Sequence, residues 1–151
     1  MSDTVVLPAG TRRRRKGPFI PPLLLIPFVI YNALGFTIFG GSPDGWSKQP
    51  GVIDIPMVSG VTWSMTWGDI LLVVGLVCLF FEMLKSTNTG RASLPEHMLS
   101  TLLLIVFIIE FILLKAAANS VFFLLTIMSL VDVVAGFSIA ITGAERDVSM
   151  D

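Results

Sequence analysis

Residues 98–114 read MLSTLLLIVFIIEFILL, and this run, with Glu110 as its one charged residue, decides the fold. A helix that crosses a bilayer needs about 20 apolar residues, and the run extends through three alanines to residue 118. Residues 19–39, 70–84 and 121–142 are comparably apolar. Hydrocarbon offers no water to unpaired backbone groups, so each stretch must be helical. The sequence therefore predicts an all-α membrane protein, with four transmembrane helices in one domain of residues 19–143.

The overall composition excludes most soluble classes of protein. Of the 151 residues, 54% are hydrophobic and 14% are charged, whereas soluble domains are about 45–50% apolar and about 25% charged. A soluble bundle is disfavoured because the second to fourth stretches lack the polar stripe of an amphipathic helix. A single cysteine, Cys78, and a single histidine, His97, argue against a disulfide or a Cys/His metal centre. No catalytic, phosphate-binding or dinucleotide motif occurs, so we expect no enzyme activity, cofactor or metal.

The first apolar stretch follows a basic cluster, an arrangement that signal peptides share. It is longer than a signal-peptide core, and no small-residue cleavage site follows it. We therefore interpret it as a mature helix. Pro21 and Pro22 are expected in its first turn, where a missing N–H is tolerated. Pro27 lies deeper, and we expect it to kink the helix.

Basic residues are concentrated on one side of the predicted bundle. The N-terminal tail, residues 1–18, carries five in succession: Arg12, Arg13, Arg14, Arg15 and Lys16. The second connection contains Lys85 and Arg91, whereas the first, residues 40–68, contains a single lysine. The positive-inside rule thus places both termini, including the tail of residues 144–151, in the cytoplasm and the first connection outside. We expect a bacterial inner membrane, with the basic run on anionic lipid headgroups and no nucleic-acid partner.

The outer connection has the pattern of a short β-hairpin. Apolar residues alternate with Ser and Thr over residues 61–67, which is the period of a strand. Residues 52–58 are the expected partner strand, joined by a turn at Ser59-Gly60. Tryptophan prefers the membrane–water boundary, and all three tryptophans lie in this connection: Trp46, Trp63 and Trp67. We interpret them as an outer-interface anchor, the alternative being a docking surface for another subunit.

Three charged residues are expected near the ends of helices. Asp69 and Lys115 lie at a similar outer level, so we predict an ion pair between them. Glu82 lies towards the cytoplasmic end of the second helix. It can reach the headgroups or pair with Lys85 or Arg91.

Glu110 and Asp132 are predicted near the middle of the bilayer. A charge at that depth costs about 2.5–3.5 kcal/mol on insertion scales, so protein should shelter both carboxyls. A protonated carboxyl can donate a hydrogen bond, and the candidate partners are Ser129, Thr126 and Asn32. Two hypotheses follow. The acids either bind or relay a proton or cation, or they form hydrogen-bonded contacts within the bundle or with a partner protein.

Small residues mark one face of the fourth helix. Ser129, Asp132, Gly136 and Ala140 recur at spacings of three and four residues. Faces of this kind let two helices approach closely, and their polar residues bond across the contact. The expected match on the first helix is the pair Asn32 and Gly35.

Two parts of the chain resemble a group of small inner-membrane proteins of alphaproteobacteria. The first contains GD at 68–69, FFE at 80–82 and TGR at 89–91, and the second contains FFLL at 122–125 and VDVVAGF at 131–137. The resemblance covers the last three helices and implies a location and a topology but no particular activity. In size and helix number the chain is also similar to small membrane subunits of tripartite transporters.

These features favour a non-catalytic accessory or assembly subunit of a larger membrane complex. The partner would be another membrane protein or a second copy of the chain. The alternative is a small oligomeric proton- or cation-coupled transporter that uses Glu110 and Asp132.

Overall fold

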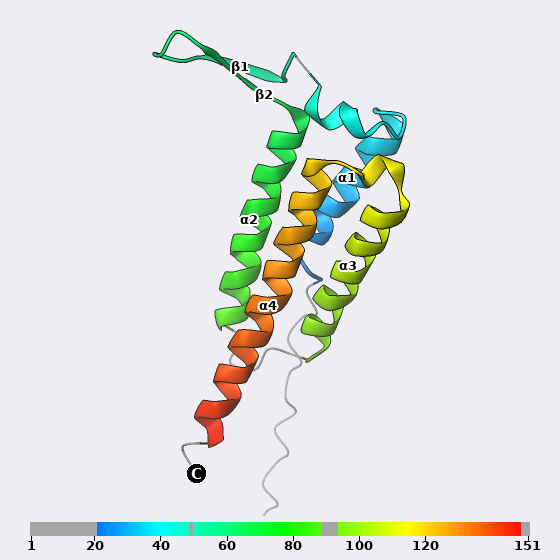
Figure 1. The fold of residues 1–151 in the computed structure, drawn as a ribbon. Helices are drawn as coiled ribbons and strands as arrows, with labels where there is room; N and C mark the ends of the chain where they lie inside the picture. The colour runs from blue at the N-terminus through cyan, green and yellow to red at the C-terminus, as the bar shows by residue number, and fades with distance from the viewer. Residues whose placement is uncertain (1–20, 49, 89–93, 149–151) are drawn as a thin grey trace, which may run out of the picture.

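The computed structural model describes residues 21–48, 50–88 and 94–148. Figure 1 shows the hairpin and two short helices gathered at one end of the long helices, here called the hairpin end. The opposite end, which holds residues 88 and 94, is the far end. The elements in chain order are α1 (Leu25–Thr37), the 3-10 helix η1 (Pro43–Ser47), strands β1 (Ile53–Pro56) and β2 (Thr62–Met65), α2 (Trp67–Asn88), α3 (Leu94–Leu113), the 3-10 helix η2 (Lys115–Ala117) and α4 (Ser120–Val148).

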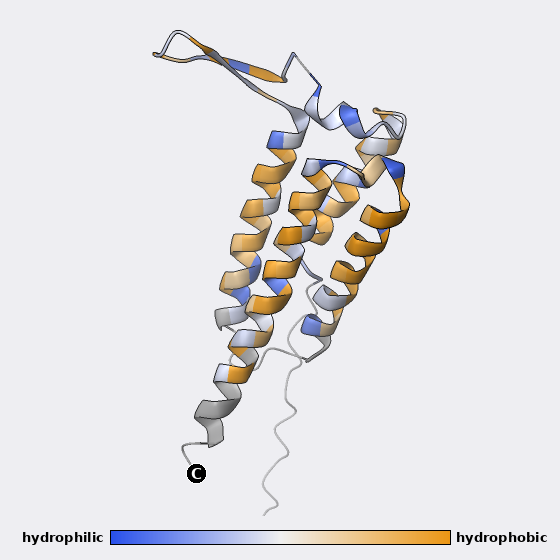
Figure 2. Cartoon of the chain, in the orientation of Figure 1, coloured by the Kyte–Doolittle hydropathy of each residue, from blue (hydrophilic) through white to orange (hydrophobic). Residues whose placement is uncertain are grey.

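Three of these helices are long and apolar enough to cross a membrane. The spans are Trp67–Ser86 in α2, Glu96–Leu113 in α3 and Ser120–Ile139 in α4, and Figure 2 shows that these stretches consist largely of hydrophobic residues. The predictions of a mostly helical fold with apolar helices able to span a membrane, and of a hairpin between the first two helices, are confirmed. Helix α1 has only 13 residues, which is about 20 Å at 1.5 Å per residue and short of a hydrocarbon core of about 30 Å.

The start of α1 differs from the sequence prediction. The helix begins at Leu25, so Pro21 and Pro22 precede it and Pro27 falls within its first turn. The expected positions of the prolines in the helix were therefore wrong. The N–H groups of the first helical turn have no partner within the helix. Pro27 therefore removes no helical hydrogen bond at this position, and α1 does not need to kink. Pro21 and Pro22 have no N–H, which suits a non-helical entry into an apolar bundle.

Helix α4 lies between α2 and α3 and packs on both (Figure 1). Buried positions on α2 recur at spacings of three and four: Gly68, Leu71, Gly75, Cys78 and Glu82. This repeat is the period of a helix packed along one seam. The glycines of this seam allow α4 to approach α2 closely. A Cβ added at Gly75, for example, would lie only 2.9 Å from the Leu125 side chain.

Gly68 leaves no room for a side chain between α2 and its neighbours, and we expect Gly68→Ala to destabilise the fold. The added Cβ would lie 2.5 Å from Val121 Cγ2 and 2.9 Å from the Trp46 carbonyl oxygen. Overpacking of this kind costs about 2 kcal/mol. Unfolding in mixed detergent micelles measures the loss.

Gly35→Ala is the matched control, because its Cβ would meet nothing closer than 3.8 Å, at Trp46 Nε1. Alanine is the better helix former by about 1 kcal/mol, so this variant should be neutral or more stable. Equal losses in the two variants would contradict the packing described for α2.

Helix α2 begins with a reciprocal cap. The Asp69 carboxylate accepts hydrogen bonds from the Thr66 backbone N–H at 2.8 Å and from its hydroxyl at 2.7 Å, and the Asp69 N–H donates to Thr66 Oγ1 at 3.3 Å. This is a capping box. Lys115 is exposed, and the ion pairs found between described residues do not include one with Asp69. The predicted Asp69–Lys115 pair is wrong, because the carboxylate is already used at the helix start.

The hairpin was predicted correctly in position and turn. Strand β1 pairs antiparallel with β2 from Ile53–Met65 to Pro56–Thr62. Gly60 has φ of 82°, a left-handed conformation that glycine adopts without strain. The hairpin therefore turns at the Ser59-Gly60 position.

Candidate functional site

Glu110 on α3 is hydrogen-bonded to α1 near the hairpin end. Asn32 Nδ2 donates to Glu110 Oε2 at 3.2 Å and to the Phe28 carbonyl at 3.2 Å. Asn32 was one of three partners that the sequence suggested for the two acids. The contact ties α1 to α3, and it gives the half-buried carboxyl a polar partner.

Tyr31 and Asn119 form a second tie beside the first. Tyr31 Oη donates to the Ala116 carbonyl at 2.7 Å, and Asn119 Nδ2 donates to Tyr31 Oη and to the same carbonyl. Asn119 Oδ1 also accepts the Phe122 N–H at 3.1 Å and so caps α4. We call Tyr31, Asn32, Glu110 and Asn119 the hairpin-end polar layer.

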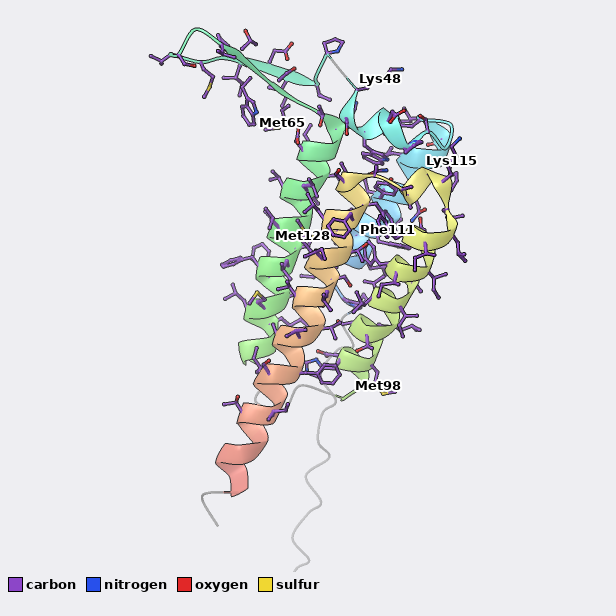
Figure 3. All side chains as sticks on the ribbon, viewed as in Figure 1. Lys48, Met65, Met98, Phe111, Lys115 and Met128 are labelled. Atoms are coloured by element: carbon purple, nitrogen blue, oxygen red, sulfur yellow. The ribbon has the colours of Figure 1, made fainter. Side chains whose placement is uncertain are left out.

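Glu110 lies far from the middle of the bundle, contrary to the sequence prediction. Helix α3 ends at Leu113 and η2 follows, so Glu110 is only about 5 Å from the end of its span at 1.5 Å per residue. Figure 3 marks this end of the bundle by Lys115 and the far end by Met98. The span does not continue to residue 118, because the Ala116 carbonyl is bonded to Tyr31 and Asn119.

We expect Asn32→Leu to weaken the fold modestly. It removes the side-chain donor to Glu110, and hydrogen bonds between membrane helices contribute about 1 kcal/mol. The free energy of unfolding in mixed micelles measures the effect. Ala33→Leu, at the exposed neighbouring position, should change little, and an equal effect of the two substitutions would contradict the tie.

An aromatic layer fills the bundle below the hairpin-end polar layer. Phe107 and Phe122 are each 0% exposed. Phe28 lies edge-on to Phe107 at 4.7 Å between centroids, and Phe107 lies 5.4 Å from Phe122. We call Phe28, Phe107 and Phe122 the aromatic layer. Edge-to-face rings at these distances pack favourably and leave an apolar interior at this level.

Glu82 on α2 lies in the core towards the far end and is 5% exposed. Its Oε2 accepts the Leu23 backbone N–H at 2.8 Å, just before α1 begins, and its Oε1 lies 3.1 Å from Lys85 Nζ. Lys85 Nζ also lies 3.6 Å from Glu96 Oε2 on α3. Of the options considered from the sequence, Glu82 takes the Lys85 pair. Its bond to Leu23 was not foreseen.

Asp132 on α4 lies beside this group and is also 5% exposed. The Ser100 side chain from α3 is hydrogen-bonded to its carboxyl, and Glu82 and Lys85 interact with it electrostatically. Ser129, one turn earlier, is buried. We call Glu82, Lys85, Ser100 and Asp132 the far-end polar layer.

The two acids singled out from the sequence are thus in different layers. Asp132 lies 12 residues from the start of α4, about 18 Å at 1.5 Å per residue, whereas Glu110 lies about 5 Å from the same end of the bundle. Asn32 donates a hydrogen bond to Glu110. Among the described residues, the groups that interact with the Asp132 carboxyl do not include Asn32. A single site that uses both acids is therefore not formed.

The small residues of α4 do not pack on α1 as expected. Gly136 faces α3, since a Cβ there would lie 2.7 Å from His97 Nδ1, and His97 stacks on Phe137. Gly35 of α1 faces Trp46 instead. The predicted match of Gly136 with Gly35 is wrong, and the Ala140 side chain lies outside the described residues.

The three tryptophans have two different environments. Trp46 is 1% exposed, stacked on Tyr31 at 4.6 Å and edge-on to Phe39 at 4.9 Å. Its prediction as an interface anchor was wrong, because Tyr31, Phe39 and Gly35 form a pocket for the indole. Trp63 and Trp67 are 47% and 46% exposed. The predicted lipid-binding run, Arg12 to Lys16, lies outside the described residues.

The polar residues in these layers form helix contacts and no recognised metal centre. Within the described ranges, no group of three or more His, Cys, Asp and Glu is placed to hold a metal ion. No protein-family model, curated protein or solved structure matches the chain.

Proposed function

We propose that the chain is a small, non-catalytic accessory or assembly subunit of a larger membrane complex. The observation that supports this proposal most strongly is that the buried carboxylates bind groups of the same chain. Glu110 is bonded to Asn32, and Glu82 to Leu23 and Lys85, so these carboxylates join helices of the same chain. The aromatic layer separates the two polar layers. Contacts of this kind build a rigid unit whose role lies in what its outer surface binds.

The outer surface supports the same proposal. Helix α4 packs on α2 and α3, yet its outward side is a strip of exposed apolar side chains: Phe123, Leu124, Ile127, Leu130, Val134 and Phe137. Similar exposed apolar side chains occur on α2, such as Val77, and on α3, such as Ile109. Such surfaces suit lipid and the helices of another membrane protein equally well. We place the subunit in a bacterial inner membrane with the far end cytoplasmic, following the basic residues of the sequence.

Purification of the full chain from native membranes in a mild detergent tests the proposal. We expect it to elute with a second membrane protein, or with a second copy, in fixed stoichiometry. One tryptophan substitution on each outward face, Val77→Trp, Ile109→Trp and Val134→Trp, then maps the contact. Lipid-facing positions should tolerate the ring, and at least one variant should lose the complex while staying folded. A monodisperse monomer without a stoichiometric partner would contradict the proposal.

A second candidate is proton- or cation-coupled transport, for which the sequence suggests Glu110 and Asp132. The observation in its favour is Asp132 itself, 5% exposed and close to Ser100, Glu82 and Lys85. Flux into liposomes that contain the purified chain separates the two functions. An accessory subunit gives no flux above protein-free liposomes. A transporter that uses Asp132 gives flux that falls in Asp132→Asn.

A further inference from the structure

The hairpin has one polar and one apolar face. Its register pairs Ile53 with Met65 and Ile55 with Trp63, and these pairs alternate with Asp54–Ser64 and Pro56–Thr62. Successive side chains of a strand point to opposite sides, so the first two pairs share a face. We call Ile53, Ile55, Trp63 and Met65 the apolar hairpin face. Three of its members are 40–47% exposed: Ile53, Ile55 and Trp63.

The position of the hairpin relative to the membrane follows from the chain itself. Strand β2 ends at Met65, and Trp67 begins both α2 and its membrane span. In Figure 1 the hairpin leaves the end of α2 sideways, across the direction of the helices, and Figure 3 marks Met65 at this junction. The hairpin is therefore attached where the apolar span of α2 begins, and it runs across the direction of the helices.

The chemistry of the hairpin suits the boundary between membrane and water. Asp54, its one charged side chain, lies on the polar face and accepts a hydrogen bond from Ser64 Oγ. The turn adds three exposed apolar side chains: Met57, Val58 and Val61. An isolated two-stranded hairpin is marginal in water, so its exposed apolar surface requires a partner. Trp63 and Trp67 are half-exposed, and tryptophan is enriched at the boundary between membrane and water.

We propose that the apolar hairpin face binds the surface of a phospholipid bilayer. The hairpin lies flat on the leaflet at the hairpin end, with the Trp63 indole among the headgroups and the polar face towards water. Lipid is the occupant because the leaflet that surrounds α2, with exposed side chains such as Val73 and Leu76, reaches the level of Trp67 where the hairpin begins. The proposal does not depend on the accessory-subunit function.

Quenching of Trp63 fluorescence in phosphatidylcholine vesicles tests this proposal. The full chain is reconstituted alone, and the difference between wild type and Trp63→Phe isolates the signal of Trp63, because Trp46 and Trp67 are present in both proteins. Lipid brominated near the headgroup end of its acyl chains should quench this signal at least about two-fold more than lipid brominated at the chain ends. Aqueous iodide should quench it less than it quenches free indole. The proposal would be overturned if iodide quenched Trp63 as strongly as free indole and brominated lipid did not quench it. That result is expected for a face that binds a protein partner.

Two lysine variants on opposite faces provide the matched control. Ile55→Lys places a charge on the apolar hairpin face, and Thr62→Lys places the same charge on the polar face. Lipid quenching of Trp63 should fall about two-fold or more in the first variant and stay unchanged in the second, since only the first charge would enter the leaflet. Equal quenching in the two variants would contradict the assignment of the faces.

Discussion

Trp46→Ala is expected to cost about 3–5 kcal/mol of folding free energy, the range for deleting a buried aromatic ring. The indole is 1% exposed and lies against Tyr31, Phe39 and Gly35. Its removal would open a cavity where α1, η1 and the start of α2 meet, since the Trp46 carbonyl also approaches Gly68. Unfolding in mixed detergent micelles, followed by far-ultraviolet circular dichroism, measures the loss.

Trp63→Ala is the control, because Trp63 is 47% exposed and lies on the hairpin beyond the bundle. In detergent its removal should cost less than about 1 kcal/mol. An interface role for all three tryptophans would give Trp46→Ala and Trp63→Ala similar small effects. That result would contradict the position of Trp46 in the core.

Glu82→Ala is expected to cost about 3 kcal/mol, the lower end of the range for breaking a buried ion pair. The substitution removes the acceptor of the Leu23 N–H and one of the carboxylates bound to Lys85. Helix α1 should therefore lose order at its start. Hydrogen exchange of the amides that begin α1 should accelerate, and the free energy of unfolding should fall with it.

Two variants separate the contributions of Glu82. Glu82→Gln keeps an oxygen for the Leu23 N–H but loses the charge, so its loss should be intermediate. Glu96→Gln removes the longer contact with Lys85, at 3.6 Å, from a more exposed side chain, and should cost less than about 1 kcal/mol. A Glu96 variant as damaging as Glu82→Ala would show that Lys85, and not the start of α1, determines the effect.

The parts of the fold that follow from local pattern were predictable. Hydropathy alone predicts α2, α3 and α4, and the alternation of residues 61–67 after a Ser-Gly turn predicts the hairpin. The Thr66-x-x-Asp69 motif is a capping box that can be recognised in the sequence. It would have placed the start of α2 at Trp67 and removed Asp69 from the predicted ion pair.

The errors arise where a distant residue supplies a partner. Nothing near Leu23 in the sequence indicates that α1 starts after two prolines, since the acceptor of its N–H comes from Glu82, 59 residues away. Alanines at 116–118 favour a longer α3, but Tyr31 binds the Ala116 carbonyl from 85 residues away. Glu110 was therefore assigned to the middle of the membrane.

A repeat in the sequence could have placed Glu82 correctly. Gly68, Gly75 and Glu82 lie seven residues apart, and the structure buries all three on the side of α2 that faces the bundle. This spacing is typical of a helix-packing seam. An acid that continues a series of buried glycines is therefore a candidate for the core, whereas depth along the helix alone suggested the headgroups.

A pair of double-mutant cycles tests the separation of the two acids most directly. Unfolding free energies are measured for Glu110→Gln with Asp132→Asn, and for Glu110→Gln with Asn32→Leu, each alone and combined. We predict additivity within about 0.5 kcal/mol for the two acids, and a coupling of about 1 kcal/mol between Glu110 and Asn32. Strong coupling of Glu110 to Asp132, with none to Asn32, would show that the acids share one site and would contradict the layered bundle.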